Sequence, residues 1–354
     1  MHRRAFIQGA TGLGITLMAG GRPLAQDPVF LADMHFHLFF GGRNPVSRNP
    51  LAKLMKDGNA TLVNWAMVGD SLWFDNKPPH KQHRTPTPGE PLGYFRREIG
   101  RMRDHLAAQK LKTIRGPADV AMAIAGDPHV VLGVEGATLI EDNVGNVKLA
   151  YDLGVRQIQL VHYIRSSLGD FQTERPQHGG LTELGKKVVA ECNRLGILVD
   201  VAHCTEATVN DVLKISTAPI VWSHSSVVRT GQPRWDQPTW RARQLSLATA
   251  KRVAQKGGVV GLWALRVDAG PTSEDYARRL WEMADWLGED HVAFGTDFNG
   301  LGDYAMMWNY ADLRRVVEYW QRSKLPEQRI RKIAIGNYAR VLSDALKPRP
   351  LSSG

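Results

Sequence analysis

The sequence predicts an α/β fold, a (β/α)8 barrel of the TIM type, in which eight parallel strands alternate with helices. The first observation is that short runs rich in Val, Ile and Leu are separated by longer segments with helical periodicity. The second is the length, because 354 residues with 43% hydrophobic content can form one barrel with a large core. The third is the presence of long polar loops after several runs. The predicted strands are residues 29–35, 60–68, 129–135, 155–162, 197–203, 220–224, 259–263 and 292–297.

Start and stop signals place several helices between these strands. A predicted helix over residues 182–195 begins at Thr182 and ends before Gly196, and another over residues 205–215 begins at Thr205. A third predicted helix covers residues 247–255. Three Pro-rich or polar stretches are predicted to be loops at the C-terminal ends of strands: residues 76–91, 165–180 and 229–241. The sequence has no internal repeat and no linker, so residues 26–354 are predicted to form a single barrel domain.

The first 25 residues have the pattern of an export signal. Arg3 and Arg4 precede a moderately apolar, glycine-rich run, and small residues follow it. The paired arginines favour the twin-arginine route, with cleavage after Ala25 or after Gly21, and predict a periplasmic or otherwise exported protein. The alternative is a basic amphipathic N-terminal helix. No other stretch reaches 18 apolar residues, so no transmembrane helix is expected.

The composition indicates a basic protein that is not expected to bind nucleic acid. The formal net charge is +10 and the pI is about 9.7, but Arg and Lys are scattered and form no block with interleaved aromatic residues. A basic surface of this kind favours anionic small molecules or an anionic envelope. Cys192 and Cys204 are expected to be small buried residues without a disulfide.

The first predicted strand carries two candidate metal ligands. Side chains on a strand alternate between its faces, so Asp33, His35 and His37 point to one face while Met34 and Phe36 point to the other. Two imidazoles at this spacing can bind one metal ion, and imidazole suits zinc and its neighbours in the transition series. Two histidines on one strand also occur in purely structural roles. The assignment therefore depends on partners elsewhere in the chain.

Six of the predicted strands end in His, Glu or Asp. Because the C-terminal ends of barrel strands meet at one mouth, these side chains are expected to converge. They are His35 and His37 on the first strand, Glu135 on the third, His162 on the fourth, His203 on the fifth, His224 on the sixth and Asp297 on the eighth.

This set suggests two divalent metal ions. His35 and His37 would bind one ion, His203 and His224 would bind the other, and Glu135 would bridge them. Two ions roughly 3.5–4 Å apart can hold a shared hydroxide and polarise a carbonyl oxygen.

Two residues of the set are left for other roles. Asp297 is placed to take the proton from the bridging water and give it to a leaving amine. His162 could stabilise the oxyanion of a tetrahedral intermediate.

Several motifs around these residues resemble the membrane (renal) dipeptidase family of zinc peptidases, within the amidohydrolase superfamily. The resemblance is densest in residues 178–186 (HGGLTELGK), 193–203 (NRLGILVDVAH) and 218–226 (APIVWSHSS). It continues in residues 295–300 (GTDFNG) and 336–342 (GNYARVL) and is loose in residues 40–125. The motifs are specific in combination.

The resemblance implies a binuclear zinc dipeptidase. It implies His35 as a ligand of the first metal, Glu135 as the bridge, His203 and His224 as ligands of the second metal, His162 as a contact to the substrate carbonyl and Asp297 as the proton-transfer residue. The family also uses an Arg to bind the free carboxylate of the substrate, and the nearest match is Arg243, with Arg234 as the second choice. A guanidinium fork suits bidentate recognition of a carboxylate, although either residue could also be an ordinary surface Arg.

The first strand departs from the family pattern. The family has Asp-x-His-x-Asp there, whereas this chain has His37 at the last position. If His37 binds metal, the centre carries one negative charge fewer, which makes the metals more electrophilic. Alternatively, the first metal binds weakly and one ion suffices.

The sequence therefore leaves three functions open. The first is a dipeptidase whose small-molecule substrate is a dipeptide or related amide. The second is an amidohydrolase that acts on a non-peptide amide, ester or lactone, and the third is a non-catalytic metal-binding relative. A homodimer is compatible with each of them.

Overall fold

In the computed structural model, which describes residues 28–40, 50–75 and 77–349, eight parallel strands form a nearly closed barrel, as predicted. The predicted export signal, residues 1–25, lies outside the described residues. A short additional strand, β3 (Lys112–Thr113), pairs with the third strand of the barrel. The barrel strands follow one another in the order β1 (Leu31–Phe36), β2 (Ala60–Val68), β4 (His129–Glu135), β5 (Val155–Gln159), β6 (Leu198–Asp200), β7 (Val221–Trp222), β8 (Val259–Leu262) and β9 (Val292–Phe294).

Hydrogen bonds between the ends of β1 and β9 bring the first and last strands together. The Asp297 N–H donates to the His35 carbonyl at 2.9 Å, and the His37 N–H donates to the Phe298 carbonyl at 2.9 Å. The buried Asp33 carboxylate adds bonds from the Thr296 backbone N–H (2.9 Å) and hydroxyl (2.6 Å). The contact places the predicted residues of the first and eighth strands side by side.

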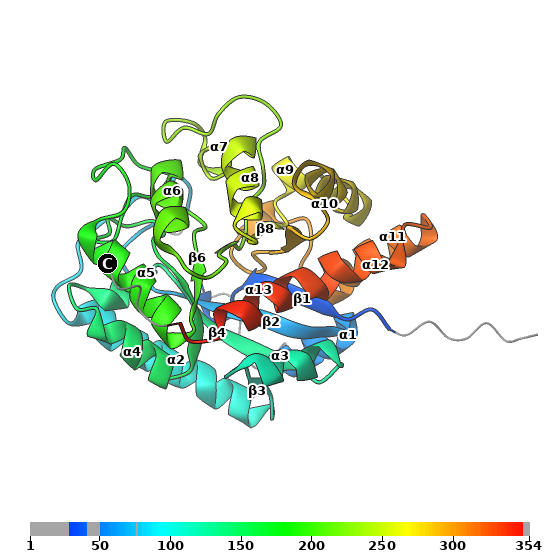
Figure 1. Ribbon diagram of the computed structural model, residues 1–354, viewed down its shortest axis with the longest axis horizontal. Helices are drawn as coiled ribbons and strands as arrows, with labels where there is room; N and C mark the ends of the chain where they lie inside the picture. Colours follow the sequence, from blue (N-terminus) through cyan, green and yellow to red (C-terminus); the bar gives the residue numbers. More distant parts are fainter. Residues whose placement is uncertain (1–27, 41–49, 76, 350–354) are drawn as a thin grey trace, which may run out of the picture.

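Helices surround the strands (Figure 1). Three predicted helix starts are confirmed, because the hydroxyls of Thr182, Thr205 and Ser246 each accept a bond from a backbone N–H in the first turn of their helix. The helices are α1 (Leu51–Gly58), α2 (Glu90–Ala108), α3 (Pro117–Ile124), α4 (Gly145–Asp152), α5 (Glu183–Leu195), α6 (Glu206–Ile215), α7 (Thr239–Ala242), α8 (Leu247–Gln255), α9 (Arg266–Ala269), α10 (Ser273–Leu287), α11 (Tyr310–Arg322), α12 (Glu327–Arg331) and α13 (Asn337–Ala345), with a π-helical segment, η4 (Lys332–Gly336), and two short 3-10 turns, η2 (Thr138–Ile140) and η3 (Gly302–Tyr304).

Two predicted loops contain helical residues. Helix α2 begins at Glu90, inside the predicted loop 76–91, and Pro91 lies in its first turn, where a missing N–H costs no intrahelical bond. The short helix α7 overlaps the end of the predicted loop 229–241. The two deviations leave the long connections after β2 and β7 intact.

Several strands are shorter than predicted, and this changes where the functional residues lie. Strand β5 ends at Gln159, β6 at Asp200, β7 at Trp222 and β9 at Phe294. His203 and Asp297 have left-handed backbone conformations with φ of 67° and 56°, which end the extended geometry before these residues. The side chains predicted at strand ends therefore lie mostly on the loops just after the strands.

The hydrophobic core leaves the C-terminal ends of the strands free for polar groups. Helix α13 (red in Figure 1) packs its Tyr338 and Leu342 into a cluster with Met34, Leu62 and Val131 from the first three barrel strands.

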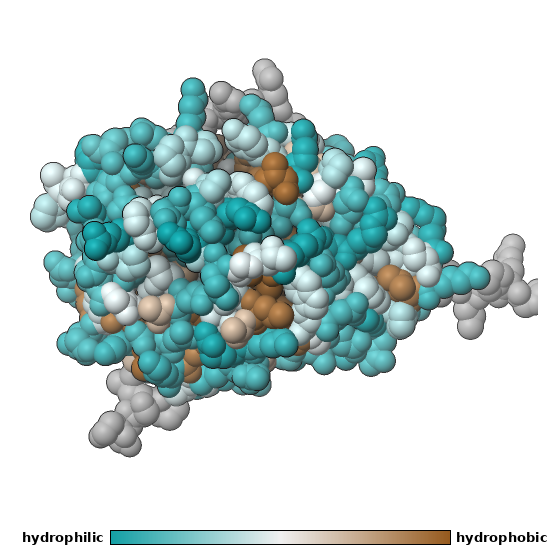
Figure 2. Space-filling view, turned by 90° about the horizontal axis from the view of Figure 1, so that it is seen from above, coloured by the Kyte–Doolittle hydropathy of each residue, from teal (hydrophilic) through white to brown (hydrophobic). Residues whose placement is uncertain are grey.

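Cys192 and Cys204 are buried and free, as expected. Among the described residues, no helix is both long and apolar enough to cross a membrane. The face in Figure 2 is largely hydrophilic, with its hydrophobic side chains in small groups.

Candidate active site

The predicted metal ligands converge on the carboxylate of Glu135. Its Oε1 lies 3.5 Å from His35 Nε2, 3.2 Å from His203 Nε2 and 3.4 Å from His224 Nε2, and its Oε2 lies 3.5 Å from His37 Nε2. All five side chains are buried. Two groups with metal-binding spacing result, His35–His37–Glu135 and Glu135–His203–His224, and they share Glu135.

The hydrogen-bond pattern of these imidazoles fits cation binding. His35 Nε2 and His37 Nε2 are 3.1 Å apart, and His203 Nε2 and His224 Nε2 are 3.2 Å apart. His37 Nδ1 donates to the Ala66 carbonyl at 2.8 Å, so the neutral ring presents a lone pair at Nε2. Pairs of ring nitrogens this close to one another, around a buried carboxylate, can share a proton or a metal ion. Four imidazole nitrogens and one carboxylate are a donor set that suits transition metals.

The charges of the cluster shift the pKa values of its members. Burial raises the pKa of Glu135, but the nearby His162 and His35 outweigh burial and hold it well below its usual value. Burial, supported by the charge of Arg243, holds the pKa values of His203 and His224 well below the usual range. His203 and His224 are therefore neutral and ready to bind a metal.

His37 differs from the other imidazoles because it faces two carboxylates. Its Nε2 lies 3.2 Å from Asp297 Oδ1, in addition to its contact with Glu135. Burial lowers the pKa of His37, but the hydrogen bond to Asp297 and the charge of Glu135 raise it to about 9. Without a metal, a proton therefore occupies this side of the centre.

The predicted proton-transfer residue, Asp297, is held against His37 by a close backbone approach. A Cβ atom on Gly300 would lie 2.0 Å from Asp297 Oδ1 and 2.9 Å from His37 Cδ2. Only glycine leaves room for this pair. Asp297 itself has a left-handed backbone, with φ of 56°, a region in which Asp is enriched among non-glycine residues.

His162 lies beside the cluster and is oriented by a residue that sequence reasoning missed. Its Nε2 is 3.5 Å from Glu135 Oε1, and its Nδ1 is 2.6 Å from Asp70 Oδ1. Asp70 is buried, and its Oδ2 accepts a bond from the Tyr163 N–H at 3.0 Å. Asp70 follows the end of β2 by two residues, so the strand-end rule used for the other strands would have found it.

Arg243 is buried at the same mouth, whereas Arg234 is not part of the site. Arg243 Nη1 donates to the Tyr163 hydroxyl at 2.9 Å, and its guanidinium carbon lies 5.1 Å from the ring centre of Trp263. Its Nε and Nη2 have no hydrogen-bond partner among the described residues, which leaves two buried donors unsatisfied. Arg234 is exposed and pairs with Asp236. The geometry therefore favours Arg243 as the residue that binds an anionic ligand group.

The predicted loop after β2 reaches the mouth through His80. The imidazole of His80 stacks on the ring of Tyr163, with centroids 4.5 Å apart and planes at 25°. Tyr163 in turn contacts the rings of His162 and His203. His80 thus packs on Tyr163, whose hydroxyl accepts the hydrogen bond from Arg243.

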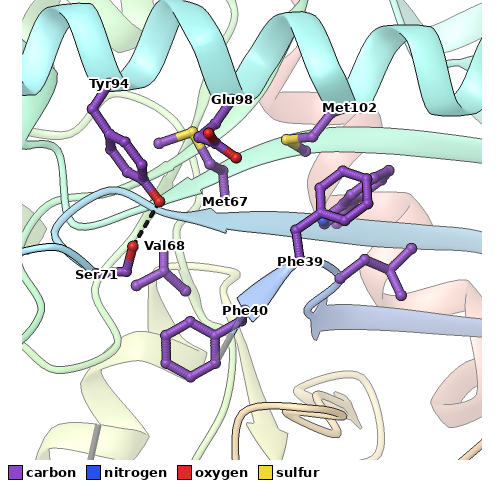
Figure 3. A pocket seen from close by; sticks show the side chains of 10 residues that line it. Phe39, Phe40, Met67, Val68, Ser71, Tyr94, Glu98 and Met102 are labelled. Carbon is purple, nitrogen blue, oxygen red and sulfur yellow. Dashed lines mark hydrogen bonds between the residues drawn. The ribbon is translucent and has the colours of Figure 1, made fainter. Parts of the chain in front are cut away.

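A separate pocket borders the cluster on the side of His37 (Figure 3). It is small and lies between α2 and the ends of β1 and β2. Phe40 lines it and also contacts His37, with ring centroids 5.4 Å apart. Across the pocket, Tyr94 and Ser71 share a 2.6 Å hydrogen bond. No metal-ligand candidate lines this pocket, so it adjoins the centre and does not contain it.

Comparisons with known proteins identify the family of this chain. A family model described as membrane dipeptidase, peptidase family M19, matches residues 92–349. The chain is 34% identical over 175 residues to dipeptidase verJ of Clonostachys rogersoniana, covering 48% of this chain and 43% of the relative. It is 27% identical over 236 residues to dipeptidase tcpJ of Claviceps purpurea (strain 20.1), covering 64% of this chain and 54% of the relative. The chain thus spans about half the length of these curated relatives.

A solved structure supports the fold. A metallo peptidase from Rhodobacter sphaeroides, solved with a phosphinate mimic of the dipeptide L-Ala-D-Ala, superposes with a TM-score of 0.75 at 24% identity. The superposition covers 90% of this chain and 100% of that one. Because the family model matches well over half of the sequence, this chain belongs to the membrane dipeptidase family, peptidase family M19.

Proposed function

We propose that this protein is a binuclear metal-dependent dipeptidase, with two divalent ions, preferably zinc, held by His35, His37, Glu135, His203 and His224. The observation that carries the proposal is the buried Arg243, which has two unpaired donors and lies at the mouth where both metal-binding groups lie. A dipeptide has a free carboxylate one residue beyond its only peptide bond. A cationic fork near the metal centre suits such a substrate.

Each residue of the site has a separate role in the proposed reaction. Two bound cations would supply a bridging hydroxide as nucleophile and polarise the carbonyl oxygen of the substrate. Arg243 would bind the carboxylate through its free Nε and Nη2 and orient the peptide bond. His162, fixed by Asp70, would donate to the developing oxyanion. Asp297 would take up a proton and pass it to the leaving amine.

The relatives suggest which dipeptides to test first. The Rhodobacter protein binds a mimic of L-Ala-D-Ala, and we propose that this chain also accepts a D-residue at the C-terminal position. The test is a panel of L,L and L,D dipeptides, given to purified protein reconstituted with Zn²⁺, with metal content measured in parallel. Protein that holds two metals and releases no amino acid from any member would refute the proposal.

Arg243 separates a dipeptidase from a second candidate. An ester, a lactone or a non-peptide amide needs no carboxylate contact, and the replacement of the family's carboxylate by His37 favours such an altered substrate range. In a dipeptidase, Arg243→Met should raise KM strongly, whereas Arg234→Met, which removes an exposed Arg, should not. Equal activity of the two variants on an ester, with no dipeptide cleavage by the unaltered protein, would favour the second candidate.

We also propose that the protein is exported by the twin-arginine signal at residues 1–25 and that it acts as a homodimer. When Arg3 and Arg4 are replaced by Lys, cell fractionation should find the protein in the cytoplasmic fraction. Light scattering on the purified protein should give twice the mass of one chain.

A further inference from the structure

The hydroxyl of Ser223 contacts one histidine of each metal-binding group. Ser223 Oγ lies 2.9 Å from His224 Nδ1 and 3.3 Å from His35 Nδ1. His35 belongs to one metal-binding group and His224 to the other, and their rings stack with centroids 3.8 Å apart. Ser223 Oγ therefore contacts Nδ1 of one candidate ligand in each metal-binding group.

The donors and acceptors of Ser223 are matched to this position. A hydroxyl has one hydrogen to donate and two lone pairs to accept with. An imidazole that binds metal through Nε2 carries its proton on Nδ1, so both histidines can donate to Ser223 Oγ. The neighbouring carboxylate of Asp200 accepts a bond from the Ser223 N–H at 3.1 Å. The two lone pairs of the hydroxyl can therefore serve the two histidines, and the Ser223 backbone is tied to Asp200.

Asp200 is itself fixed from the opposite end of the barrel. Gln157 Nε2 donates to Asp200 Oδ2 at 3.1 Å, and the Tyr338 hydroxyl on α13 donates to Gln157 Oε1 at 2.7 Å. Each of these side chains is buried. A column of hydrogen bonds thus runs from α13 through the barrel interior to Ser223.

We propose that Ser223 is a positioning residue that couples the two metal subsites, because it fixes the orientation of His35 and His224 together. This inference rests on the proposed function, since it assumes that both groups bind metal. It predicts that loss of one hydroxyl weakens metal binding on both sides of Glu135, although Ser223 touches neither metal.

The test is Zn²⁺ binding to the full chain, prepared metal-free, measured by competition with a chromophoric chelator. The unaltered protein should bind two equivalents, and Ser223→Ala should weaken both by about 10- to 100-fold, the usual cost of losing such a partner. Ser216→Ala is the matched control, because Ser216 is a buried serine that donates to the Ala218 carbonyl and contacts no metal-ligand candidate. Ser223→Cys, which keeps a weak acceptor of similar size, should give a smaller loss and replaces the alanine variant if that variant does not fold.

The outcomes separate the inference from the function. Unchanged Zn²⁺ affinity in Ser223→Ala, or a loss confined to one equivalent, would overturn the coupling role while leaving the dipeptidase proposal intact. Two bound equivalents in the unaltered protein without hydrolysis of any dipeptide would overturn the function, and a loss of both equivalents in Ser223→Ala would still support the coupling. Failure of the unaltered protein to bind two Zn²⁺ ions would overturn both.

Discussion

The carboxylate of Asp70 lies 2.6 Å from Nδ1 of His162, and both side chains are buried beside the Glu135 cluster. A carboxylate accepts hydrogen bonds and does not donate them when ionised, so it holds the proton of His162 on Nδ1 and fixes the plane of the ring. The Tyr163 N–H fixes the carboxylate in turn. The orientation of the His162 ring is therefore fixed, with Nε2 directed at the Glu135 carboxylate.

Asp70→Asn should lower kcat by about 10- to 100-fold, the range for loss of a partner that orients a functional histidine. An amide can turn its NH2 group toward Nδ1, so the ring loses its single orientation. The metal content should stay unchanged, because Asp70 contacts no metal-ligand candidate directly. Asp152→Asn, which changes an exposed carboxylate on α4, is the control. A kcat equal to that of the unaltered protein would remove Asp70 from the site.

Metal affinity should depend on pH through His37. Its pKa of about 9 in the metal-free centre, produced by Asp297 and Glu135 against the opposing effect of burial, means that a metal must displace one proton below that pH. Affinity for Zn²⁺ should therefore rise about tenfold per pH unit from pH 6 to 9. His37→Asp restores the carboxylate of the family and should flatten this dependence, since Asp is already ionised there. Competition titrations at several pH values measure the Zn²⁺ affinity of both proteins. An affinity of the unaltered protein that varies as little with pH as that of His37→Asp would contradict the prediction.

Gly300→Ala should disturb catalysis without unfolding the protein. The new Cβ would lie 2.0 Å from Asp297 Oδ1, so that carboxylate must leave its contact with His37. A displacement of this size at a reacting group costs about 100-fold in rate. Gly93→Ala is the control, because a Cβ on this α2 residue meets nothing within 4 Å. Full activity of Gly300→Ala would show that the position of Asp297 is not critical.

His80 should make the folded state less stable in acid. Burial lowers the pKa of His80 to about 4, against a hydrogen bond from its Nδ1 to the Asp75 carbonyl that raises it. The unfolded chain takes up this proton near pH 6.5 and the folded chain only near pH 4, so folding stability falls as the pH drops through this window. His80→Phe keeps an aromatic ring to stack on Tyr163 and removes the titration.

Urea denaturation at pH 7 and pH 4.5 measures this effect. The loss of stability between the two pH values should be smaller in His80→Phe than in the unaltered protein. His178→Phe, which changes an exposed histidine, should leave the loss as it was. Equal losses in His80→Phe and the unaltered protein would show that His80 takes up its proton equally in both states.

The sequence alone determined the barrel, its ligand candidates and most of its helix starts, because these follow from local patterns. Residues such as Glu135, His203 and His224 stand just at or after apolar runs, and parallel strands bring such positions to one mouth whatever the details of packing. Thr182 and Thr205 mark helix starts through bonds to N–H groups only three residues away. Neither kind of inference needs distant contacts.

Only the tertiary structure decided which side chains support those ligands. The strand-end rule could have found Asp70 as a site residue, but no spacing rule pairs it with His162, 92 positions away. The contact between Ser223 and His35, 188 positions apart, likewise appears only in the folded chain. The family resemblance already ranked Arg243 above Arg234, but the burial of Arg243 against Tyr163 and Trp263 is visible only in the folded chain. Ligand type is set by local chemistry at strand ends. The orientation and charge of each ligand are set by partners that the closed barrel brings across its interior.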